Sequence, residues 1–514
     1  MRIYRRITQS IFLLLFLCLF FLTEATGENE LGYPVRIFLD FDPLLALSSL
    51  LSSHTLAKGF LYALFLMAIT LVMGRVFCGW ICPLGALHDA VGAIAGARRS
   101  GAVRPRWFRC KYYLLFFILA SSLVTVQCAG YLDPLSLLIR SLALSIWPAC
   151  EYAIRAIFDG IYFLHIPCLT TVSESLYGIL KKTLLSFTQP FFFQGFAIGA
   201  LFVGILALNL WERRFWCRYI CPLGALLGIV SRWSAVRRWV SEGCTACGTC
   251  RSLCPSGAIV DEEGRGLSSE CLMCLECDDR CPAEAISFGW NRKGPAVPID
   301  IERRTAMAAV AAGLATAPLL RITPRMKEAA SSPFLIRPPG ARAEPDFLAA
   351  CVRCGECMKV CITNGLQPAL LQAGIEGIWT PVLVPRIGHC EYRCTLCGQV
   401  CPTGALTELT VQEKAEVKIG MAVIDRGRCL PHANGIACIV CEEVCPTAPK
   451  AIRFNEVSVR TGETQVKVLK QPYVNLEQCV GCGACEADCP VAGKPAIYVI
   501  STGESRSEAN RVLL

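Results

Sequence analysis

The sequence predicts a polytopic α-helical membrane domain with a duplicated two-helix unit, followed by small α+β domains built around cysteine motifs. Apolar residues make up 54% of the 514 residues, the mean hydropathy is +0.47, and the apolar excess lies in the first 230 residues. Such a composition is typical of a membrane protein. The α+β domains are predicted from 33 cysteines, of which 24 fall into six quartets.

The first element expected is an apolar segment from Ile11 to Leu22, which follows three arginines near the start of the chain. A short transmembrane helix and a cleaved signal peptide both fit this pattern. In either case, the chain emerges on the outer side of the membrane.

The duplicated unit consists of an Asp-Pro-Leu segment, an apolar span and the motif C-x3-C-P-L-G-A-L. The first copy has Asp42, a span over residues 60–77, and Cys78 with Cys82. The second copy has Asp133, a span over residues 196–210, and Cys217 with Cys221. A further span over residues 112–126 follows an arginine-rich loop, which the positive-inside rule assigns to the cytoplasm.

These segments predict about four transmembrane helices within residues 1–232, with the two copies parallel and both C-x3-C-P motifs at the cytoplasmic face. Between residues 133 and 194 the second copy has an extra apolar segment. Interfacial helices, re-entrant helices and an additional pair of spans all fit it.

The four cysteines of the C-x3-C-P motifs are candidates for one cofactor-binding tetrathiolate site, because duplication brings equivalent positions together: Cys78, Cys82, Cys217 and Cys221. The alternative is two similar helix ends with free thiols. Asp42 and Asp133 are candidate proton acceptors, but Asp followed by Pro is also a good helix N-cap, and we favour that interpretation. His88 is a weaker proton-acceptor candidate.

A two-cluster domain is predicted for residues 233–290 from two C-x2-C-x2-C-x3-C-P quartets. They are Cys244, Cys247, Cys250, Cys254 and Cys271, Cys274, Cys277, Cys281. This spacing is that of ferredoxin-like [4Fe-4S] domains, in which the fourth cysteine binds the neighbouring cluster. Cys281 is therefore expected to join the first three cysteines, and Cys254 to join the second three. Structural zinc is less consistent with the spacing.

Residues 300–322 contain Arg303 and Arg304 before an alanine-rich run to Leu320, a pattern like a twin-arginine export signal. We expect this segment to cross the membrane as a signal or fifth helix, because the arginines would then remain inside. Gly313 and Pro318 interrupt it, so a linker helix that stays in the cytoplasm is the alternative. A Pro-rich linker follows at residues 323–347.

The last domain, residues 348–514, contains four more quartets and short alternating segments typical of ferredoxin strands. The quartets are Cys351, Cys354, Cys357, Cys361; Cys390, Cys394, Cys397, Cys401; Cys429, Cys438, Cys441, Cys445; and Cys479, Cys482, Cys485, Cys489. The middle two enlarge the first gap, and Cys361 precedes Ile362 where proline is usual. The spacing allows pairing of adjacent motifs or nested pairing, first with fourth and second with third.

Composition also argues against other functions. The net charge of +9 is explained by basic loops beside apolar spans, so no nucleic-acid partner is expected. No C-x-x-C is followed by His, so covalent c-type haem is not expected, and no G-x-G-x-x-G after a strand suggests a flavin or nicotinamide site. Six [4Fe-4S] clusters, with one more at the membrane motifs, are the cofactors expected.

Taken together, these motifs resemble two known groups joined in one chain. Residues 1 to about 290 resemble the NapH/MauN group of membrane ferredoxin-type quinol dehydrogenases, and their membrane motifs also resemble the polyferredoxin part of NosR. Residues 303–514, with Arg303-Arg304 and the segment from Leu335 to Ala341, resemble the NapG/MauM group of exported four-cluster ferredoxins. Bulky apolar residues usual after the twin arginines are missing here.

The resemblance implies a multi-pass protein of the bacterial inner (cytoplasmic) membrane whose last domain is periplasmic. It implies electron transfer from membrane quinol to a periplasmic c-type cytochrome or reductase, as an electron-transfer component or quinol dehydrogenase. It also favours nested pairing in the last domain. The alternatives are a maturation factor that keeps a partner's cofactor reduced, and a membrane-anchored cytoplasmic polyferredoxin.

Overall fold

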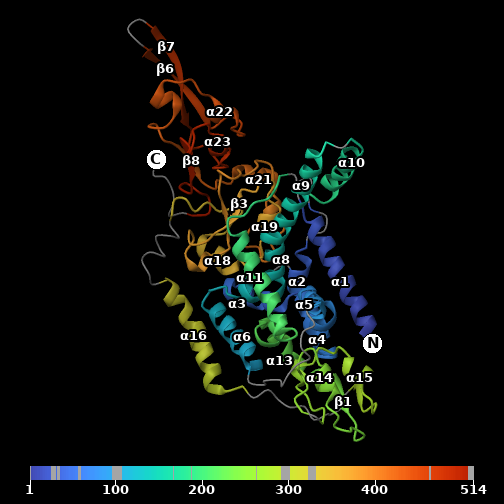
Figure 1. The fold of residues 1–514 in the computed structure, drawn as a ribbon. Helices are drawn as coiled ribbons and strands as arrows, with labels where there is room; N and C mark the ends of the chain where they lie inside the picture. The colour runs from blue at the N-terminus through green and yellow to red at the C-terminus, as the bar shows by residue number, and fades with distance from the viewer. Residues whose placement is uncertain are drawn as a thin grey trace.

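The computed structural model describes residues 2–24, 31, 35–55, 59–94, 107–165, 167–186, 188–261, 263–290, 301–321, 332–461 and 465–507. These residues form three parts along one long axis (Figure 1). A helical domain occupies the middle. The first two cysteine quartets lie at one of its ends and the last four quartets at the other.

The helical domain is built from helices throughout its described residues. They are α1 (Arg2–Leu22), α2 (Ile37–Asp40), α3 (Pro43–Ser53), α4 (Phe60–Met73), η1 (Phe77–Ile81), α5 (Pro83–Ile94), α6 (Phe108–Leu123), α7 (Ala129–Leu132), α8 (Pro134–Ser141), η3 (Leu142–Ile146), α9 (Trp147–Phe163), α10 (Pro167–Thr183), α11 (Gly195–Ala207), η4 (Leu208–Leu210), α12 (Phe215–Tyr219) and α13 (Pro222–Ser231).

The duplication is visible in the helix starts. Asp42 accepts hydrogen bonds from the second and third residues of α3, Leu44 and Leu45, and Asp133 accepts them in the same way at α8. Each aspartate is followed by proline in the first turn, where the missing N–H is not needed. The predicted N-cap role of both residues is confirmed. The two copies therefore begin with the same local structure.

Two helices of the described chain are long and apolar enough to cross a membrane: Ile3–Leu22 and Pro134–Phe163. The other predicted spans form helices, but α4, α6 and α11 have 14, 16 and 13 residues, short of the roughly 20 that cross a bilayer. The extra segment that the sequence left open forms the long α8–α9 helix and then α10, so it is a helical pair.

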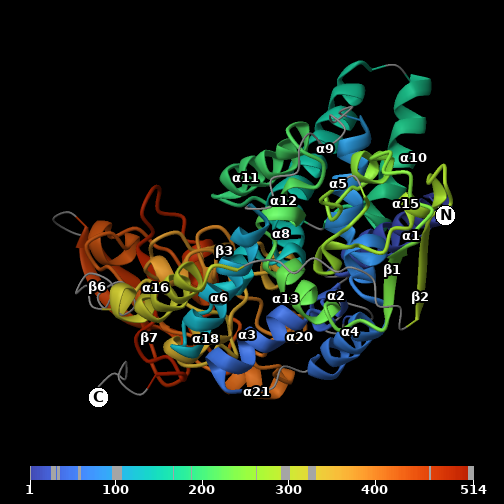
Figure 2. The same ribbon diagram turned by 90° about the horizontal axis from the view of Figure 1, so that it is seen from below.

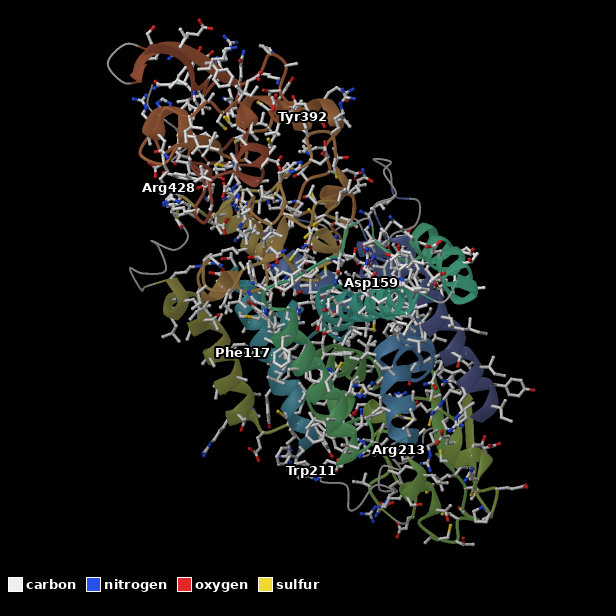
Figure 3. All side chains as sticks on the ribbon, turned by 45° about the horizontal axis from the view of Figure 1, so that its top comes forward. Phe117, Asp159, Trp211, Arg213, Tyr392 and Arg428 are labelled. Atoms are coloured by element: carbon white, nitrogen blue, oxygen red, sulfur yellow. The ribbon has the colours of Figure 1, made fainter. Side chains whose placement is uncertain are left out.

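The first cysteine domain has one antiparallel pair of strands, β1 (Val236–Val240) and β2 (Ile286–Trp290), with Val236 opposite Trp290. Between the strands lie the short helices α14 (Thr249–Leu253), η5 (Ser268–Glu270) and α15 (Glu276–Asp279). In Figure 3, Trp211 and Arg213 lie at the end of the helical domain that faces this part.

Helix α16 (Arg303–Arg321) connects the two ends of the molecule. It packs along α6, and at Gly313 a Cβ atom would stand 2.5 Å from the carbonyl oxygen of Phe117. Figure 2 shows α16 beside α6 on the outside of the helical domain. One end is near Arg109, which pairs with Glu302. The other end is at the last domain, where Arg321 pairs with Glu376.

The described residues of the last domain contain three two-stranded units and short helices. Its elements are α18 (Glu344–Ala350), α19 (Glu356–Lys359), β3 (Leu366–Pro368), η6 (Ile375–Gly377), β4 (Pro381–Leu383), α20 (Leu396–Gln399), α21 (Val411–Glu416), β5 (Met421–Ile424), η7 (Leu430–Asn434), α22 (Val440–Glu443), β6 (Ile452–Thr461), β7 (Gln465–Val474), α23 (Ala484–Ala487) and β8 (Ile497–Ile500). Strands β3 and β4, β5 and β8, and β6 and β7 pair antiparallel. The long β6–β7 hairpin forms the far tip (Figure 1).

Candidate iron–sulfur sites

The loop of each strictly spaced quartet turns sharply around its second cysteine. The residues on either side of that cysteine have positive φ in all four such quartets, for example +56° at Arg353 and +87° at Gly355. Glycine adopts this left-handed region at little cost, and three of the four quartets have glycine after the cysteine, whereas Leu275 (φ +59°) holds it in the other. In the enlarged quartets, Thr395 and Ile439 occupy that place with negative φ.

Two sites are formed in the first cysteine domain by exchange of the fourth cysteine. Site 1 is a cavity lined by Cys244, Cys247, Cys250 and Cys281. Site 2 is a cavity lined by Cys254, Cys271, Cys274 and Cys277. The structure brings together the two sets that the spacing predicted. Arg238 lines both cavities and interacts with Cys277 and Cys250, so a cation stands between the two sites.

The first two quartets of the last domain also exchange their fourth cysteines. Site 3 groups Cys351, Cys354, Cys357 and Cys401 through mutual electrostatic contacts. Site 4 is a cavity lined by Cys361, Cys390, Cys394 and Cys397. Cys361 lines this cavity with the others even though Ile362 replaces the usual proline.

The remaining two quartets form the last pair. Site 5 is a cavity lined by Cys445, Cys479, Cys482 and Cys485, and site 6 by Cys429, Cys438, Cys441 and Cys489. Pairing is therefore between adjacent motifs, and the expectation of nested pairing was wrong. The physical reason is that β5, before the third quartet, pairs with β8, after the fourth, which closes these two quartets into one unit.

Neighbouring sites of the last domain lie close to one another. Cys357 of site 3 interacts electrostatically with Cys397 of site 4. The backbone N–H of Cys390 donates to the carbonyl of Cys482 at 2.8 Å, which joins sites 4 and 5. Cys485 interacts with Cys441 of site 6. Sites 3, 4, 5 and 6 therefore form a continuous row.

The thiols of these sites suit a cationic iron centre. Burial raises the pKa of Cys277 to about 12 and that of Cys390 to about 11, and it raises the pKa of Cys485 well above its ordinary value. A thiolate there requires a positive partner, which iron provides. Backbone N–H groups also reach the sulfurs, such as Ala422 N to Cys479 Sγ at 3.4 Å. Hydrogen bonds of this kind tune cluster potentials.

The four cysteines of the C-x3-C-P motifs converge inside the helical domain. Cys221 interacts electrostatically with Cys217, Cys78 and Cys82, and Cys82 interacts with Cys78 and Cys217. Cys82 and Cys221 are 8% and 6% exposed. We call this group the helical site. It brings together one pair of thiols from each copy of the duplication.

Two buried arginines interact with the helical site, and each lies three residues before the first cysteine of its copy. Arg75 interacts with Cys78 and also with Cys221 of the other copy. Arg214 interacts with Cys217 and Cys82, and it donates to the carbonyl of Cys78 at 3.0 Å. Each guanidinium therefore reaches the thiols of both copies, and two positive charges stand beside four potential thiolates.

Carboxylates from outside the motifs hold these arginines. Arg214 makes a bidentate pair with Asp89 at 2.8 and 2.7 Å. Arg75 donates to Glu270 at 2.9 Å, and Glu270 also accepts from Lys111 and from Tyr112. Glu270 precedes the site 2 ligand Cys271 in the chain, so one buried network links the helical site to site 2.

The first cysteine domain is fitted tightly against the helical site. Trp80, between the two cysteines of the first motif, donates from Nε1 to the carbonyl of Met273 at 2.9 Å. At Gly79, a Cβ atom would lie 2.3 Å from the carbonyl oxygen of Leu272. Leu272 and Met273 belong to the site 2 loop. The loops of the two sites therefore touch through backbone.

Site 3 is docked on the opposite end of the helical domain. Arg140 of α8 lies over the ring of Trp379 at 4.4 Å, and Arg353 of the site 3 loop lies over the ring of Tyr131 at 4.4 Å. Arg140 also donates to the carbonyl of Arg353 at 3.1 Å. A Cβ atom on Gly130 would stand 1.9 Å from the carbonyl oxygen of Val352. Each part thus provides an arginine and an aromatic ring to the other.

The candidate proton acceptors lie inside the helical domain. Asp42 and Asp133 are fully buried, and their side chains interact with each other. His88 is 1% exposed, and Asn209 donates to its Nδ1 at 2.6 Å. Two carboxylates in contact in a dry interior share a proton, because both cannot be ionised. The aspartates cap helices and also form this pair.

Sequence reasoning missed the arginines and carboxylates around the helical site. Comparison of the two copies would have found Arg75 and Arg214, since each stands three residues before the first cysteine. Glu270 and Asp89 had no such signal, because their partners lie 195 and 125 residues away in the chain.

Comparisons with known proteins agree with this geometry. A family model described as a 4Fe-4S binding domain matches residues 58–101, 194–239 and 396–417, and the first two segments contain the four helical-site cysteines. A second 4Fe-4S binding domain model matches residues 238–260, and a 4Fe-4S dicluster domain model matches residues 434–492.

Among relatives, the methylamine utilization ferredoxin-type protein MauM of Methylorubrum extorquens is 38% identical over 35% of this chain and 80% of its own length. The ferredoxin-type protein NapG of Escherichia coli is 36% identical over 36% of this chain and 78% of its own length. The putative electron transport protein YccM of Escherichia coli is 29% identical over 48% of this chain and 58% of its own length.

The cysteine sites and the matched domains define an iron–sulfur electron-transfer protein of the ferredoxin type. The chain belongs to the family of MauM and NapG ferredoxin-type proteins.

Proposed function

We propose that this chain is a multi-pass protein of the bacterial inner membrane that carries electrons from the quinol pool to a periplasmic redox partner, a c-type cytochrome or a reductase. The observation that carries the proposal is the order of the sites along the molecule. Sites 1 and 2 and the helical site lie toward one end, and sites 3 to 6 form a row at the other.

The proposal includes seven [4Fe-4S] clusters, one in each of sites 1 to 6 and one in the helical site, with the cysteines named for each site as ligands. Clusters supply one-electron redox chemistry when bound. The protein holds the loops of neighbouring sites together by hydrogen bonds to backbone carbonyls. Trp80 donates to the carbonyl of Met273, and Cys390 donates to the carbonyl of Cys482. The guanidinium groups of Arg75 and Arg214 balance the negative charge of the helical site.

A membrane location is supported by the surface of the helices. Large apolar side chains project outward from α1, α4 and α11, for example Ile3, Leu61 and Phe196, which is 90% exposed. Many exposed apolar side chains on a water-facing surface would favour aggregation, whereas lipid would cover them. Trp211 and Trp233 are exposed, and Trp211 lies at the end of the helical domain that faces the first cysteine domain (Figure 3), where an interfacial aromatic belt would stand.

The proposal assigns a role and a side of the membrane to each domain. Residues 1–232 form the membrane domain, residues 233–290 a cytoplasmic two-cluster domain, residues 300–322 a crossing helix, residues 323–347 a linker, and residues 348–514 a periplasmic four-cluster domain. The crossing is supported by α16, which runs beside α6 from Glu302 to Arg321 and so reaches the end where site 3 is docked.

Anaerobic reduction of the purified protein tests the proposal. Menadiol should reduce the clusters of the detergent-solubilised protein at catalytic rates, and iron analysis should give about 28 iron atoms per chain. The variant Cys78→Ser/Cys217→Ser should lose about four of them, while Cys110→Ser, outside every site, should lose none. Reduction by dithionite but not by menadiol would refute quinol oxidation and favour a maturation role.

Topology requires a separate test. A reporter that is active only outside the membrane, fused after Leu514, should be active, and the same reporter fused after Trp290 should be inactive. Activity at neither position would place all six ferredoxin sites in the cytoplasm and overturn the outward route.

A further inference from the structure

Arg238 gives the first pair of iron–sulfur sites a feature that sites 4, 5 and 6 do not share. It lines the cavities of both site 1 and site 2. Among the described residues, no arginine or lysine lines the cavities of sites 4, 5 and 6. A cation shared by two cysteine sites is therefore a property of the first cysteine domain that the spacing of its motifs does not explain.

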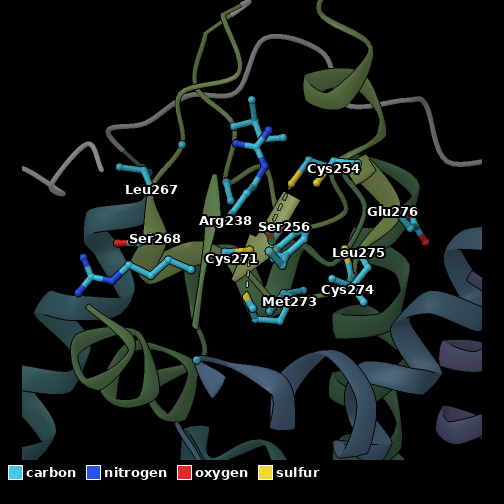
Figure 4. Close-up of a pocket in the computed structure, with 18 of the residues that line it drawn as sticks. Arg238, Cys254, Ser256, Leu267, Ser268, Cys271, Met273, Cys274, Leu275 and Glu276 are labelled. Atoms are coloured by element: carbon cyan, nitrogen blue, oxygen red, sulfur yellow. Dashed lines mark hydrogen bonds between the residues drawn. The ribbon is translucent and has the colours of Figure 1, made fainter. Parts of the chain in front are cut away.

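Strand β1 places Arg238 between the two sites. Alternate residues of a strand point to the same face, so Val236, Arg238 and Val240 share one face of β1. Val236 lines the cavity of site 2 only, whereas Arg238 and Val240 line both cavities. Figure 4 shows Arg238 beside Cys254, with Cys271 below. The strand therefore passes from one site to the other, and Arg238 lies where the two cavities adjoin.

One nitrogen of Arg238 fixes the guanidinium, and two remain for the sites. Nη1 donates to the carbonyl oxygen of Gly264. A Cβ atom at Gly264 would stand 3.4 Å from Arg238 Nη2 and 3.7 Å from Cys250 Sγ, so Nη2 and this site 1 sulfur face the same point. Nε and Nη2 are buried and have no hydrogen-bond partner in the described part of the chain. Buried N–H groups normally have acceptors, so these two nitrogens indicate acceptor atoms within the cavities.

The two sites can supply these acceptors. Cys250 of site 1 and Cys277 of site 2 both interact electrostatically with Arg238. A [4Fe-4S] cluster bound at either site would offer further sulfur atoms that accept hydrogen bonds. A guanidinium has five N–H donors in a fixed fork, so one arginine can serve two sites at once, whereas a lysine has a single nitrogen.

We propose that Arg238 is shared between sites 1 and 2, where it donates hydrogen bonds toward both clusters and keeps both reduction potentials less negative. The proposal rests on the clusters assigned to these sites in the proposed function, and it adds the residue that couples them. Positive charge and hydrogen bonds at the sulfurs favour the reduced cluster, which has one more negative charge. Each site accepts one electron, at a potential that depends on the same side chain.

A redox titration of the full chain tests this role. The protein is purified anaerobically in detergent, reduced stepwise with dithionite and followed by EPR, so neither quinol nor a partner protein is needed. In Arg238→Gln, about two spins per chain should become harder to reduce than in wild type. The equilibrium constant for reduction should fall at least about tenfold for each, which is about 59 mV for a one-electron step. The rest of the signal should titrate as in wild type.

Two further variants separate redox tuning from a structural role. Arg238→Lys keeps the charge but replaces the fork by one nitrogen, so both potentials should return only part of the way to wild type. Arg280→Gln removes an equal charge from the same domain, but Arg280 is exposed and its charge is screened by solvent. In that control, neither equilibrium constant should change by more than about threefold. The iron content should be the same in all these proteins.

Every outcome supports or overturns the shared role. If only one spin shifts in Arg238→Gln, the arginine serves a single site and the inference fails. If no spin shifts, or if both Arg238 variants lose iron, the arginine is only structural and the inference fails as well. If Arg238→Gln alone loses iron, Arg238→Lys becomes the test variant, and a smaller shift of about two spins is still expected.

Failure of the inference can be told apart from failure of the proposed function. None of the shifts above depends on quinol, so a negative result leaves the proposed electron route untouched. Wild-type protein that lacks about eight of the expected iron atoms, and whose EPR signal is smaller by about two spins, would instead overturn the assignment of clusters to sites 1 and 2.

Discussion

The contact between Gly130 and the carbonyl oxygen of Val352 leads to a strong prediction about how the last domain is attached. An alanine methyl at Gly130 would stand 1.9 Å from that oxygen, whereas carbon and oxygen normally approach to about 3.3 Å. Gly130→Ala therefore pushes the site 3 loop about 1.4 Å away from the helical domain.

A displacement of this size would break the neighbouring contacts. The bond from Arg140 to the carbonyl of Arg353 is 3.1 Å long and would exceed the hydrogen-bonding range. Two cation–π contacts, each worth about 0.5–2 kcal/mol, would also open. With one charged hydrogen bond at about 1.5–3 kcal/mol, the docking should weaken by about 3 kcal/mol.

Hydrogen exchange and electron transfer report on this docking. In Gly130→Ala, backbone exchange at residues 349–354 should accelerate by about two orders of magnitude, and menadiol should reduce sites 3 to 6 more slowly while site 2 is reduced at the wild-type rate. Gly160→Ala is the matched control, since nothing stands within 4 Å of that position on α9. Unchanged exchange at residues 349–354 in Gly130→Ala would refute the reasoning.

Three further predictions concern buried charges. Glu270→Gln should lower the stability of the first cysteine domain by about 3–5 kcal/mol, seen as earlier thermal loss of its clusters, because two buried cations lose their partner. Asp42→Asn should change the melting temperature little, whereas Asp42→Ala should cost about 1 kcal/mol through the lost cap. Burial would raise the pKa of Glu344, but Arg337 and Arg506 lower it overall. The ionised Glu344 therefore contributes fully to stability at neutral pH, and this contribution declines as the pH falls below about 4.5. Glu344→Gln should reduce the loss of unfolding free energy that is measured below that pH.

Local features of this protein could be predicted from the sequence. The crossed cysteine sets of sites 1 and 2 follow from motif spacing, and the caps at Asp42 and Asp133 follow from the residues themselves. Each of these depends on a few neighbouring positions and on geometry that such motifs share.

Long-range features could not be predicted in the same way. Adjacent pairing in the last domain depends on the antiparallel match of β5 with β8, strands about 75 residues apart, and no spacing between cysteines contains that information. The partnership of Arg75 with Glu270 depends on the docking of one domain against another. A charge that will be buried has no distinctive sequence signature, so only the fold identifies it.

The duplication gives a final prediction, because each arginine of the helical site serves the thiols of both copies. Arg75 interacts with Cys221, and Arg214 interacts with Cys82, so the loss of either removes one positive charge from the same cluster. Less positive charge makes the cluster harder to reduce, so Arg75→Gln and Arg214→Gln should each shift its reduction potential to more negative values in an EPR-monitored titration. Arg75→Lys keeps the charge, so its reduction potential should lie close to the wild-type value. The reduction potentials of sites 3 to 6 should be the same in all these variants. If the potential is the same in both Gln variants and in wild type, the arginines act only as structural partners of Glu270 and Asp89.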